Sequence, residues 1–233
     1  LLARRLPEFT PHRRLFLNVH VDGPAEIHDR LTGVPGSTQR ALGAIAAARA
    51  AGFEVTTNTT VYADTPAAAV AALFGRLTEM GVRGMMLAPA FAYDVGIGAP
   101  TLRPAEVHAW MRTFRAAWGE RNLTHTPAYM EFLRGERALS CVPWGTVTYS
   151  VHGWKRPCYL LTDGYAESCA GLLADTPWDG YGPGRDARCA GCMLHSGFEP
   201  AVMSSLRTPA DLWRMARWQL GGEGWRRRGR RPI

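Results

Sequence analysis

The stretch LFLNVHV at residues 15–21, followed by DGP at 22–24, decides the fold class. Its run of apolar residues predicts a buried strand that ends in a turn. A loop carrying Glu26, His28 and Asp29 is expected to follow. This strand opens a longer pattern of alternating elements.

The pattern alternates between strands and helices as far as residue 118. Helices are expected at 37–51, 66–80 and 104–118, and strands at 53–61 and 84–89. Ser37 and Thr65 are the expected N-caps, and Pro66 suits a first helical turn. Because the helices are long enough to cross over between parallel strands, the order predicts an α/β fold, as part of a β/α barrel or of an open sheet.

The beginning of the chain suggests that sequence is missing. Leu1 is not an initiating methionine, and residues 1–14 are irregular and basic. Three parallel strands form only a fragment of a barrel or open sheet and would leave a strand edge exposed. We therefore expect the protein to continue before Leu1.

Polar residues stand where the predicted strands end. Ligands of parallel α/β folds meet the carboxyl ends of the strands. This rule selects His20, Asp22, Asn58, Thr60, Pro89, Tyr93 and Asp94. We predict that His20, Asp22 and Asn58 bind a cofactor. The alternatives are a buried structural histidine, a turn-capping aspartate and an inward-facing amide.

Four of the five cysteines form two groups between residues 141 and 192. Cys141 and Cys158 are widely spaced, whereas Cys189 and Cys192 form a C-x-x-C motif whose two thiolates can reach one ion or cluster. Four thiolates favour iron–sulfur or zinc over magnesium or calcium. A redox dithiol, a disulfide and free thiols are the alternatives. Cys169 is interpreted as a small buried hydrophobe in a short helix.

Aromatic residues are frequent around these cysteines. They are Trp144, Tyr149, Trp154, Tyr159, Tyr165, Trp178 and Tyr181. We expect them to keep water from a metal cluster, with base stacking as the alternative. Further on, residues 211–220 predict a helix that packs an apolar face on the domain.

Composition and charge restrict the class of protein. The 233 residues are 46% hydrophobic, which is enough for a core, and no apolar run approaches the length needed to span a bilayer. A cytoplasmic protein is expected. Five arginines of the net +7 charge lie at 226–231. We expect a solvated basic tail; attraction to anionic lipid is the alternative, and nucleic acid is not an expected partner.

Short motifs in both halves resemble a known class of enzyme. VHVDG at 19–23, HD at 28–29, GFEV at 52–55 and NTT at 58–60 resemble the middle of radical S-adenosylmethionine enzymes. The second half resembles the C-terminal domain of the adenosylhopane-forming radical enzymes of hopanoid biosynthesis. Its motifs are C-x-P-W-G at 141–145, G-W-x-R-P-C-Y-L-L at 153–161, G-Y at 164–165, W-x-x-Y-G at 178–182 and C-A-x-C-M-x-H at 189–195.

The resemblance implies a fold and a domain organisation. The fold would be the C-terminal part of a radical SAM partial (β/α) barrel followed by a small Cys-rich C-terminal domain. The expected division is an irregular segment at 1–14, the barrel part at 15–125, the metal-binding module at 126–205, and a helix with a basic tail at 206–233.

The resemblance also implies cofactors and metal ligands. Cys141, Cys158, Cys189 and Cys192 would hold an auxiliary [4Fe–4S] cluster. A second cluster and S-adenosylmethionine would require a C-x-x-x-C-x-x-C loop upstream of Leu1, so the 233 residues alone would be inactive. The family pattern also leads us to expect a cysteine where Ser196 stands.

The reaction implied is the addition of a 5′-deoxyadenosyl radical to the terminal alkene of hopene. The partners would be hopene and an electron donor such as flavodoxin or ferredoxin, with peripheral contact at the inner membrane. Met85, Met86, Leu87, Phe91 and Tyr93 are candidate cavity residues or ordinary core. No catalytic residue is assigned.

Two other classes of function stay open. One is a noncatalytic zinc-binding scaffold built on the same four cysteines. The other is a basic RNA-binding protein that depends on the arginines at 226–231.

Overall fold

A parallel sheet lies at the centre of the first half of the chain. The computed structural model describes residues 2–91 and 101–221. Strands β1 (Phe16–His20), β2 (Glu54–Val61) and β3 (Gly84–Pro89) are parallel and lie in the order β1-β2-β3. His20 is in register with Asn58, which in turn is in register with Met86. The predicted strands and the α/β class are confirmed.

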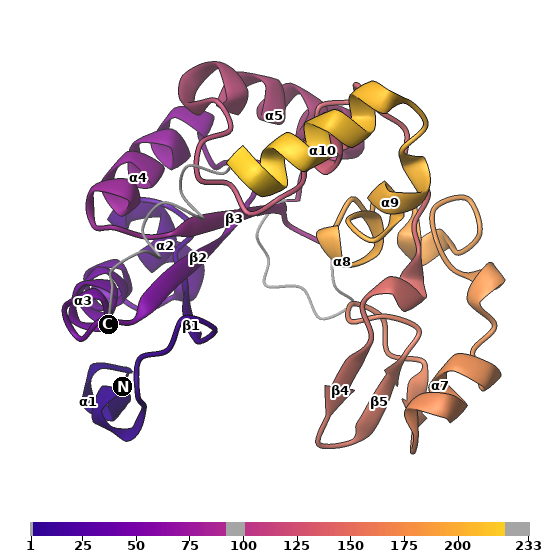
Figure 1. Ribbon diagram of the computed structural model, residues 1–233, viewed down its shortest axis with the longest axis horizontal. Helices are drawn as coiled ribbons and strands as arrows, with labels where there is room; N and C mark the ends of the chain where they lie inside the picture. The colour runs from indigo at the N-terminus through magenta and orange to yellow at the C-terminus, as the bar shows by residue number, and fades with distance from the viewer. Residues whose placement is uncertain (1, 92–100, 222–233) are drawn as a thin grey trace.

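Helices cover one side of this sheet. They include α2 (Ala25–Thr32), α3 (Ser37–Ala50), α4 (Ala67–Glu79) and α5 (Pro104–Trp118), preceded by the short α1 (Leu2–Arg5) and η1 (Leu6–Glu8). In Figure 1, α3, α4 and α5 form the outer layer of this part of the molecule. The predicted helices therefore occur, and α5 has the predicted bounds.

The sheet has an apolar face and a polar face. Residues of β2 alternate between buried and half-buried along its whole length. Val55 and Val61 are fully buried in one core cluster with side chains of the covering helices, such as Phe74 and Phe114. The opposite face carries Asn18, His20 and Asn58 and is much less buried. Because successive side chains of a strand point to opposite faces, the sheet has one face in the core and one polar face.

Two local predictions near α2 and α3 were wrong. Residues 26–29 lie in α2 rather than in a loop, because Ile27 and His28 are buried. Ser37 is the first residue of α3 and not its cap, since the carboxylate of Asp29 accepts from the amides of Gly36 and Thr38 at 2.5 and 2.8 Å. These contacts depress the pKa of Asp29, led by the Thr38 amide.

The N-cap predicted for α4 is also wrong. The helix begins at Ala67 with Pro66 in the cap position, and no side chain caps it. The hydroxyl of Thr65 instead accepts a hydrogen bond from the backbone amide of Tyr62 at 3.2 Å. Thr65 therefore closes the turn that precedes the helix.

The second half of the chain contains shorter elements. They are α6 (Pro127–Leu133), η2 (Pro143–Gly145), β4 (Thr148–Ser150), β5 (Gly153–Arg156), β6 (Gly164–Ala166), α7 (Cys169–Asp175), η3 (Trp178–Gly180), η4 (Ala187–Cys189), α8 (His195–Phe198), α9 (Ala201–Ser205) and α10 (Pro209–Gly221). Strand β5 pairs antiparallel with both β4 and β6. Cys169 is half-buried, so the expectation of a buried thiol was wrong.

One apolar core joins the two halves. Met193, Phe198 and Val202 belong to the same buried cluster as the sheet residues. The rings of Phe132 and Phe198 stack with centroids 4.4 Å apart. Packing is thus continuous across residue 125, where the sequence placed a boundary; the boundaries themselves stay a prediction.

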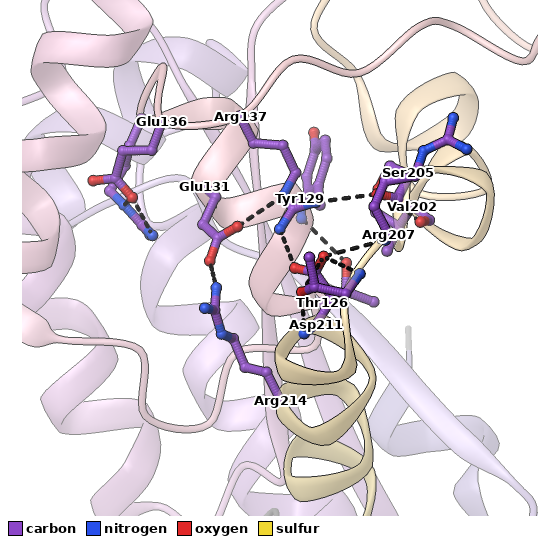
Figure 2. A network of polar contacts seen from close by, with 12 residues as sticks. Thr126, Tyr129, Glu131, Glu136, Arg137, Val202, Ser205, Arg207, Asp211 and Arg214 are labelled. Carbon is purple, nitrogen blue, oxygen red and sulfur yellow. Dashed lines mark hydrogen bonds and ion pairs between the residues drawn. The ribbon is translucent and has the colours of Figure 1, made fainter.

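Helix α10 packs differently from the prediction. Met215 packs against the main core, but Leu212, Trp213 and Leu220 are exposed. Asp211 and Arg214 connect the helix to the remainder of the fold through Arg137 and Glu131 (Figure 2). The helix is present, but most of its apolar side chains face outward.

Some predictions fall outside the described part of the chain. Tyr93, Asp94 and the arginines at 226–231 lie outside the described residues. Among the residues that are described, no helix has both the length and the apolar character needed to cross a membrane.

Candidate functional site

The four predicted cysteine ligands share one pocket. Cys141, Cys158, Cys189 and Cys192 all line it, together with Phe91, Pro143, Pro157, Leu160, Leu161, Tyr181, Gly182, Pro183, Ser196 and Gly197. The empty space at this pocket is about 430 Å³, which includes open solvent at its mouth. Two cysteine pairs that are distant in sequence are therefore brought together.

Burial and proximity make three of the thiols hard to ionise, those of Cys141, Cys189 and Cys192. Burial raises the pKa of Cys141 to about 12, and the charges of Cys192, Cys158 and Cys189 add to the rise. Burial likewise raises the pKa of Cys192 to about 11, and that of Cys189 is raised for the same reason. A bound cation would offset both effects, because metal binding replaces thiol protons.

Backbone amides are directed at two of the sulfur atoms. The amide of Gly182 hydrogen-bonds to the sulfur of Cys189, and that of Leu194 to the sulfur of Cys192; both favour the thiolate. The guanidinium of Arg185 donates to the carbonyl of Cys141 at 3.3 Å and favours the Cys141 thiolate. Hydrogen bonds of this kind tune thiolate ligands in metal sites.

Ion pairs hold together two of the loops that carry cysteines. Arg188, next to Cys189, lies 2.6 Å from Asp163 and 2.7 Å from Asp186. The hydroxyl of Tyr181 also donates to Asp163 at 2.8 Å. Asp163 follows the segment of Cys158, so these contacts fix the two cysteine segments relative to each other.

The wall beside Cys141 is very close-packed. A Cβ atom on Gly197 would lie 2.5 Å from the sulfur of Cys141, so only glycine fits there. The neighbouring Ser196 is buried and lines the pocket in the position where the family pattern led us to expect a cysteine.

The thiols share a pocket without converging on one point. Across residues 2–91 and 101–221, no three or more His, Cys, Asp or Glu side chains are arranged so that they could hold a metal ion as they stand. The donor set, four thiols with amides on two of them, is nevertheless that of an iron–sulfur or zinc site. The residues present fit such a group chemically.

Most of the aromatic residues do not shield this pocket. Of the seven aromatic residues noted in the sequence, Tyr181 is the one that lines it within the described chain. Trp144, Tyr149, Tyr159 and Tyr165 are exposed. The apolar lining comes instead from Phe91, Leu160 and Leu161, since these lie on the segments that carry or face the cysteines.

The predicted cofactor residues form a second group. Nε2 of His20 lies 2.7 Å from Oδ2 of Asp22, and Nδ2 of Asn58 lies 3.4 Å from Nδ1 of His20. The amide of Thr60 donates to Asp22 at 2.8 Å. Oδ1 of Asn58 is buried and has no hydrogen-bond partner in the described chain. His20, Asp22 and Asn58 thus come together as a polar group.

Asp22 is the ionised centre of that group. Burial opposes ionisation, but the contacts with His20, His28 and the Thr60 amide outweigh it and lower the pKa of Asp22 to about 2. The hydrogen bond to Asp22 raises the pKa of His20. Sequence reasoning did not assign His28, whose Nδ1 accepts from the Asp22 amide at 3.1 Å. The sequence feature that could have indicated a role for His28 is the HD motif at 28–29, of which it is part.

Both groups lie at the carboxyl edge of the parallel sheet. His20 ends β1, Asn58 and Thr60 lie in the last half of β2, and Ala88 lies near the end of β3. Ala88 forms a small apolar cluster with Leu160 and Leu194, and Cys158 and Cys192 pack against that cluster. The thiol pocket is therefore anchored at the edge where the polar group also lies.

The apolar candidates on β3 divide between two environments. Met85 and Leu87 are fully buried in the main core. They therefore have the role of ordinary core residues, which was the alternative to lining a substrate cavity. Met86 is half-buried on the face that carries Asn58. Phe91 lines the thiol pocket.

A buried polar junction escaped sequence reasoning. His125 is buried between Glu199 and the backbone of Leu87, with Nδ1 2.8 Å from Oε1 of Glu199. His195 lies beside it, and burial lowers the pKa of His195. The hydroxyl of Tyr129 donates to the carbonyl of Met193 at 2.8 Å. This junction connects β3 to the segment after the C-x-x-C motif.

Comparisons with known proteins place the chain in a family. Residues 85–215 match the family described as "Domain of unknown function (DUF3463)". No match was found among curated proteins. A solved structure described as "Native anSMEcpe with bound AdoMet and Kp18Cys peptide" is 17% identical, with a TM-score of 0.48. The match covers 74% of this chain and 53% of that one, so this chain spans about half the length of its relative. Because the family match extends over more than half of its residues, the chain belongs to the DUF3463 family.

Proposed function

We propose that the protein is part of a radical S-adenosylmethionine enzyme in which Cys141, Cys158, Cys189 and Cys192 hold an auxiliary [4Fe–4S] cluster. The observation that carries the proposal is that these four thiols line a single pocket. Thiolates are the usual ligands of such clusters. The motifs around each cysteine, which resemble the adenosylhopane-forming enzymes, support the same assignment.

The residues around the pocket would control the environment of the bound group. When present, a [4Fe–4S] cluster supplies one-electron chemistry. The apolar side chains of the lining would limit contact between the group and water, and the amides of Gly182 and Leu194 would stabilise negative charge on the sulfurs. Arg185 places a positive charge near Cys141. Each of these features shifts the potential of a cluster.

His20, Asp22 and Asn58 are proposed to bind S-adenosylmethionine. Asp22 keeps His20 oriented, and His20 presents a side chain that is 48% exposed. The unpartnered Oδ1 of Asn58 would accept a hydrogen bond from a ligand hydroxyl or amine. The cluster that cleaves the cofactor would require a C-x-x-x-C-x-x-C loop, a motif that these 233 residues do not contain.

The finer proposal concerns the substrate and its partners. The motif resemblance in the second half supports hopene, whose terminal alkene would receive the 5′-deoxyadenosyl group, and a flavodoxin or ferredoxin as electron donor. Addition of hopene in detergent micelles should raise the melting temperature of the protein. Micelles with a saturated hydrocarbon of similar size are the control, and equal shifts would contradict selective binding.

Metal analysis tests the cluster directly. The protein is expressed without oxygen, reconstituted with iron and sulfide, and analysed for iron, sulfide and zinc. We expect about four irons and four sulfides per chain and a paramagnetic resonance signal after reduction. Cys189→Ala should lose both. Cys169→Ala is the matched control, because Cys169 does not line the pocket, and it should keep them.

A zinc-binding scaffold is the second candidate, because four thiols also satisfy zinc. The same analysis separates the two candidates. About one zinc per chain with no iron, lost in Cys189→Ala, would favour the scaffold and contradict the cluster.

Cofactor binding has its own control on the same face of the sheet. Asn58→Ala and His20→Ala should each weaken S-adenosylmethionine binding in calorimetry by about tenfold, which is the loss of one good hydrogen bond to a charged ligand. Asn18 lies two residues before His20 and bonds to Thr56 at 3.0 Å. Asn18→Ala should bind normally; equal weakening in all three variants would contradict the assignment.

A further inference from the structure

Ser196 is a buried polar residue in the wall of the thiol pocket. It is 5% exposed and lies in α8, the short helix that follows the C-x-x-C motif. It lines the pocket together with all four of the proposed cysteine ligands. Tyr181 also lines the pocket, but its hydroxyl already donates to Asp163 at 2.8 Å. Ser196 is thus the lining residue whose hydroxyl proton has no assigned acceptor.

The hydroxyl of Ser196 is free to bind an occupant of the pocket. Within residues 2–91 and 101–221 it forms no hydrogen bond to another residue. It also differs from Oδ1 of Asn58, an unpartnered atom that is closed off from solvent. Buried hydroxyls are rarely left without a partner. An unpartnered hydroxyl in the wall of a candidate metal site therefore indicates that the bound group accepts its proton.

The backbone on both sides of Ser196 is fixed relative to the thiols. The carbonyl of Gly197 accepts a hydrogen bond from the amide of the residue after Cys141, at 2.9 Å. A Cβ atom on Gly197 would lie 2.5 Å from the sulfur of Cys141. On the other side, the amide of Leu194 hydrogen-bonds to the sulfur of Cys192. Ser196 therefore lies on a segment that contacts one cysteine of each pair.

We propose that the hydroxyl of Ser196 donates a hydrogen bond to a sulfur atom of the [4Fe–4S] cluster and raises its reduction potential. The inference rests on the proposed function, in which four thiolates supply the four ligands. A hydrogen bond to sulfur stabilises the more negative, reduced form of a cluster more than the oxidised form. Ser196 would thus touch the cofactor and tune its potential without being a ligand.

A redox titration of the reconstituted protein tests the proposal. Ser196→Ala keeps the Cβ atom and removes only the oxygen, so the variant should bind about four irons and four sulfides, like the parent. Loss of one hydrogen bond to a charged acceptor changes an equilibrium constant by about tenfold. The midpoint potential, followed by paramagnetic resonance, should therefore become more negative by about 59 mV, the equivalent of tenfold for a one-electron couple.

The metal-free protein provides a second measurement. Because the hydroxyl of Ser196 has no partner within the described residues, Ser196→Ala should melt at the same temperature as the parent when neither contains metal. A clearly lower melting temperature would show that the hydroxyl has a partner in the protein itself. That result would overturn the proposal whatever the metal content.

Ser204 provides the matched control. It is exposed on α9, its hydroxyl donates to the carbonyl of Ala201 at 2.9 Å, and Ser204→Ala should keep the parent's potential. An unchanged potential in Ser196→Ala, or loss of its iron, would overturn this inference, while a parent with four irons would leave the proposed function standing. A parent that binds no iron would overturn the proposed function, and this inference with it.

Discussion

Nδ1 of His125 lies 2.8 Å from Oε1 of Glu199, a residue 74 positions further along the chain. The same carboxylate accepts from the amide and the hydroxyl of Thr126 at 3.1 and 2.8 Å. Nε2 of His125 lies 2.7 Å from the carbonyl oxygen of Leu87 and 3.1 Å from its amide nitrogen. One buried imidazole thus connects β3 to the segment that follows the C-x-x-C motif.

Loss of the negative charge at this junction should destabilise the protein. Glu199→Gln replaces an acceptor facing Thr126 or His125 by an amide N–H, so one donor loses its partner. We expect the free energy of unfolding in urea to fall by about 1.5–3 kcal/mol. Glu167 is exposed, and Glu167→Gln should change it by less than about 0.5 kcal/mol. Similar losses in both variants would contradict a special role for the junction.

The ionisation of His20 should depend on Asp22. Because Asp22 raises the pKa of His20, the histidine should titrate above its ordinary value of 6.5 in proton NMR. In Asp22→Asn the pKa of His20 should fall, since the remaining burial lowers it. A His20 titration that is the same in both proteins would rule out the ion pair.

The contributions of His20 and Asp22 to stability should depend on pH in opposite directions. The stability that His20 contributes is fully present below pH 6.5 and is lost as the pH rises through its raised pKa. The stability that Asp22 contributes is present above its ordinary pKa of 3.8 and is lost as the pH falls toward about 2. Asp22→Asn should remove both slopes from a plot of unfolding free energy against pH.

A single methyl group should disturb the thiol pocket. In Gly197→Ala, the new Cβ would meet the sulfur of Cys141 at 2.5 Å, so the helix or the cysteine must move. We expect the metal content after reconstitution to fall by at least half. Gly191→Ala is the control: it lies between Cys189 and Cys192, yet a Cβ there meets nothing within 4 Å. If Gly191→Ala loses as much metal, close packing at Gly197 is not the cause.

Arg137 should hold α10 in place. Its guanidinium lies 2.8 Å from Glu131 and 2.5 Å from Asp211. The hydrogen bond from Arg137 is the largest of the contacts that lower the pKa of Asp211 to about 2. In Arg137→Ala, amide hydrogen exchange across residues 209–221 should accelerate about tenfold, as expected for the loss of a charged hydrogen bond.

The control for that experiment is an arginine with no link to α10. Arg76 is exposed on α4, and Arg76→Ala should leave exchange in α10 unchanged. Exchange at the parent rate in Arg137→Ala would show that apolar contacts such as that of Met215 hold the helix on their own.

Much of the secondary structure was readable from short-range patterns. The alternation in β2 and the bounds of α5 depend on residues a few positions apart, so local sequence was sufficient. The cap of α3 was missed because Asp29, eight residues before Ser37, reaches it through space. The start of α2 was missed because Gly23 and Pro24 indicate a turn, whereas burial of Ile27 and His28 favours a helix.

The candidate site, like the secondary structure, could be predicted from the sequence only in part. The sequence predicted which thiols and which polar residues at the strand ends belong to the candidate site, since residue type and spacing indicate that chemistry. Only the tertiary structure shows that Cys141 and Cys158 line the same pocket as Cys189 and Cys192, with the glycine at position 197 leaving room for the sulfur of Cys141.

The local sequence pattern could not predict which face α10 exposes to solvent. The sequence determined an amphipathic helix, but both Met215 and Leu212 are apolar, and periodicity alone favours neither for the core. The tertiary structure decided between them through the contact of Arg137 with Asp211, which spans 74 positions. Local spacing specifies the elements, whereas pairing across a long loop depends on shape and charge that come together only when the chain has folded.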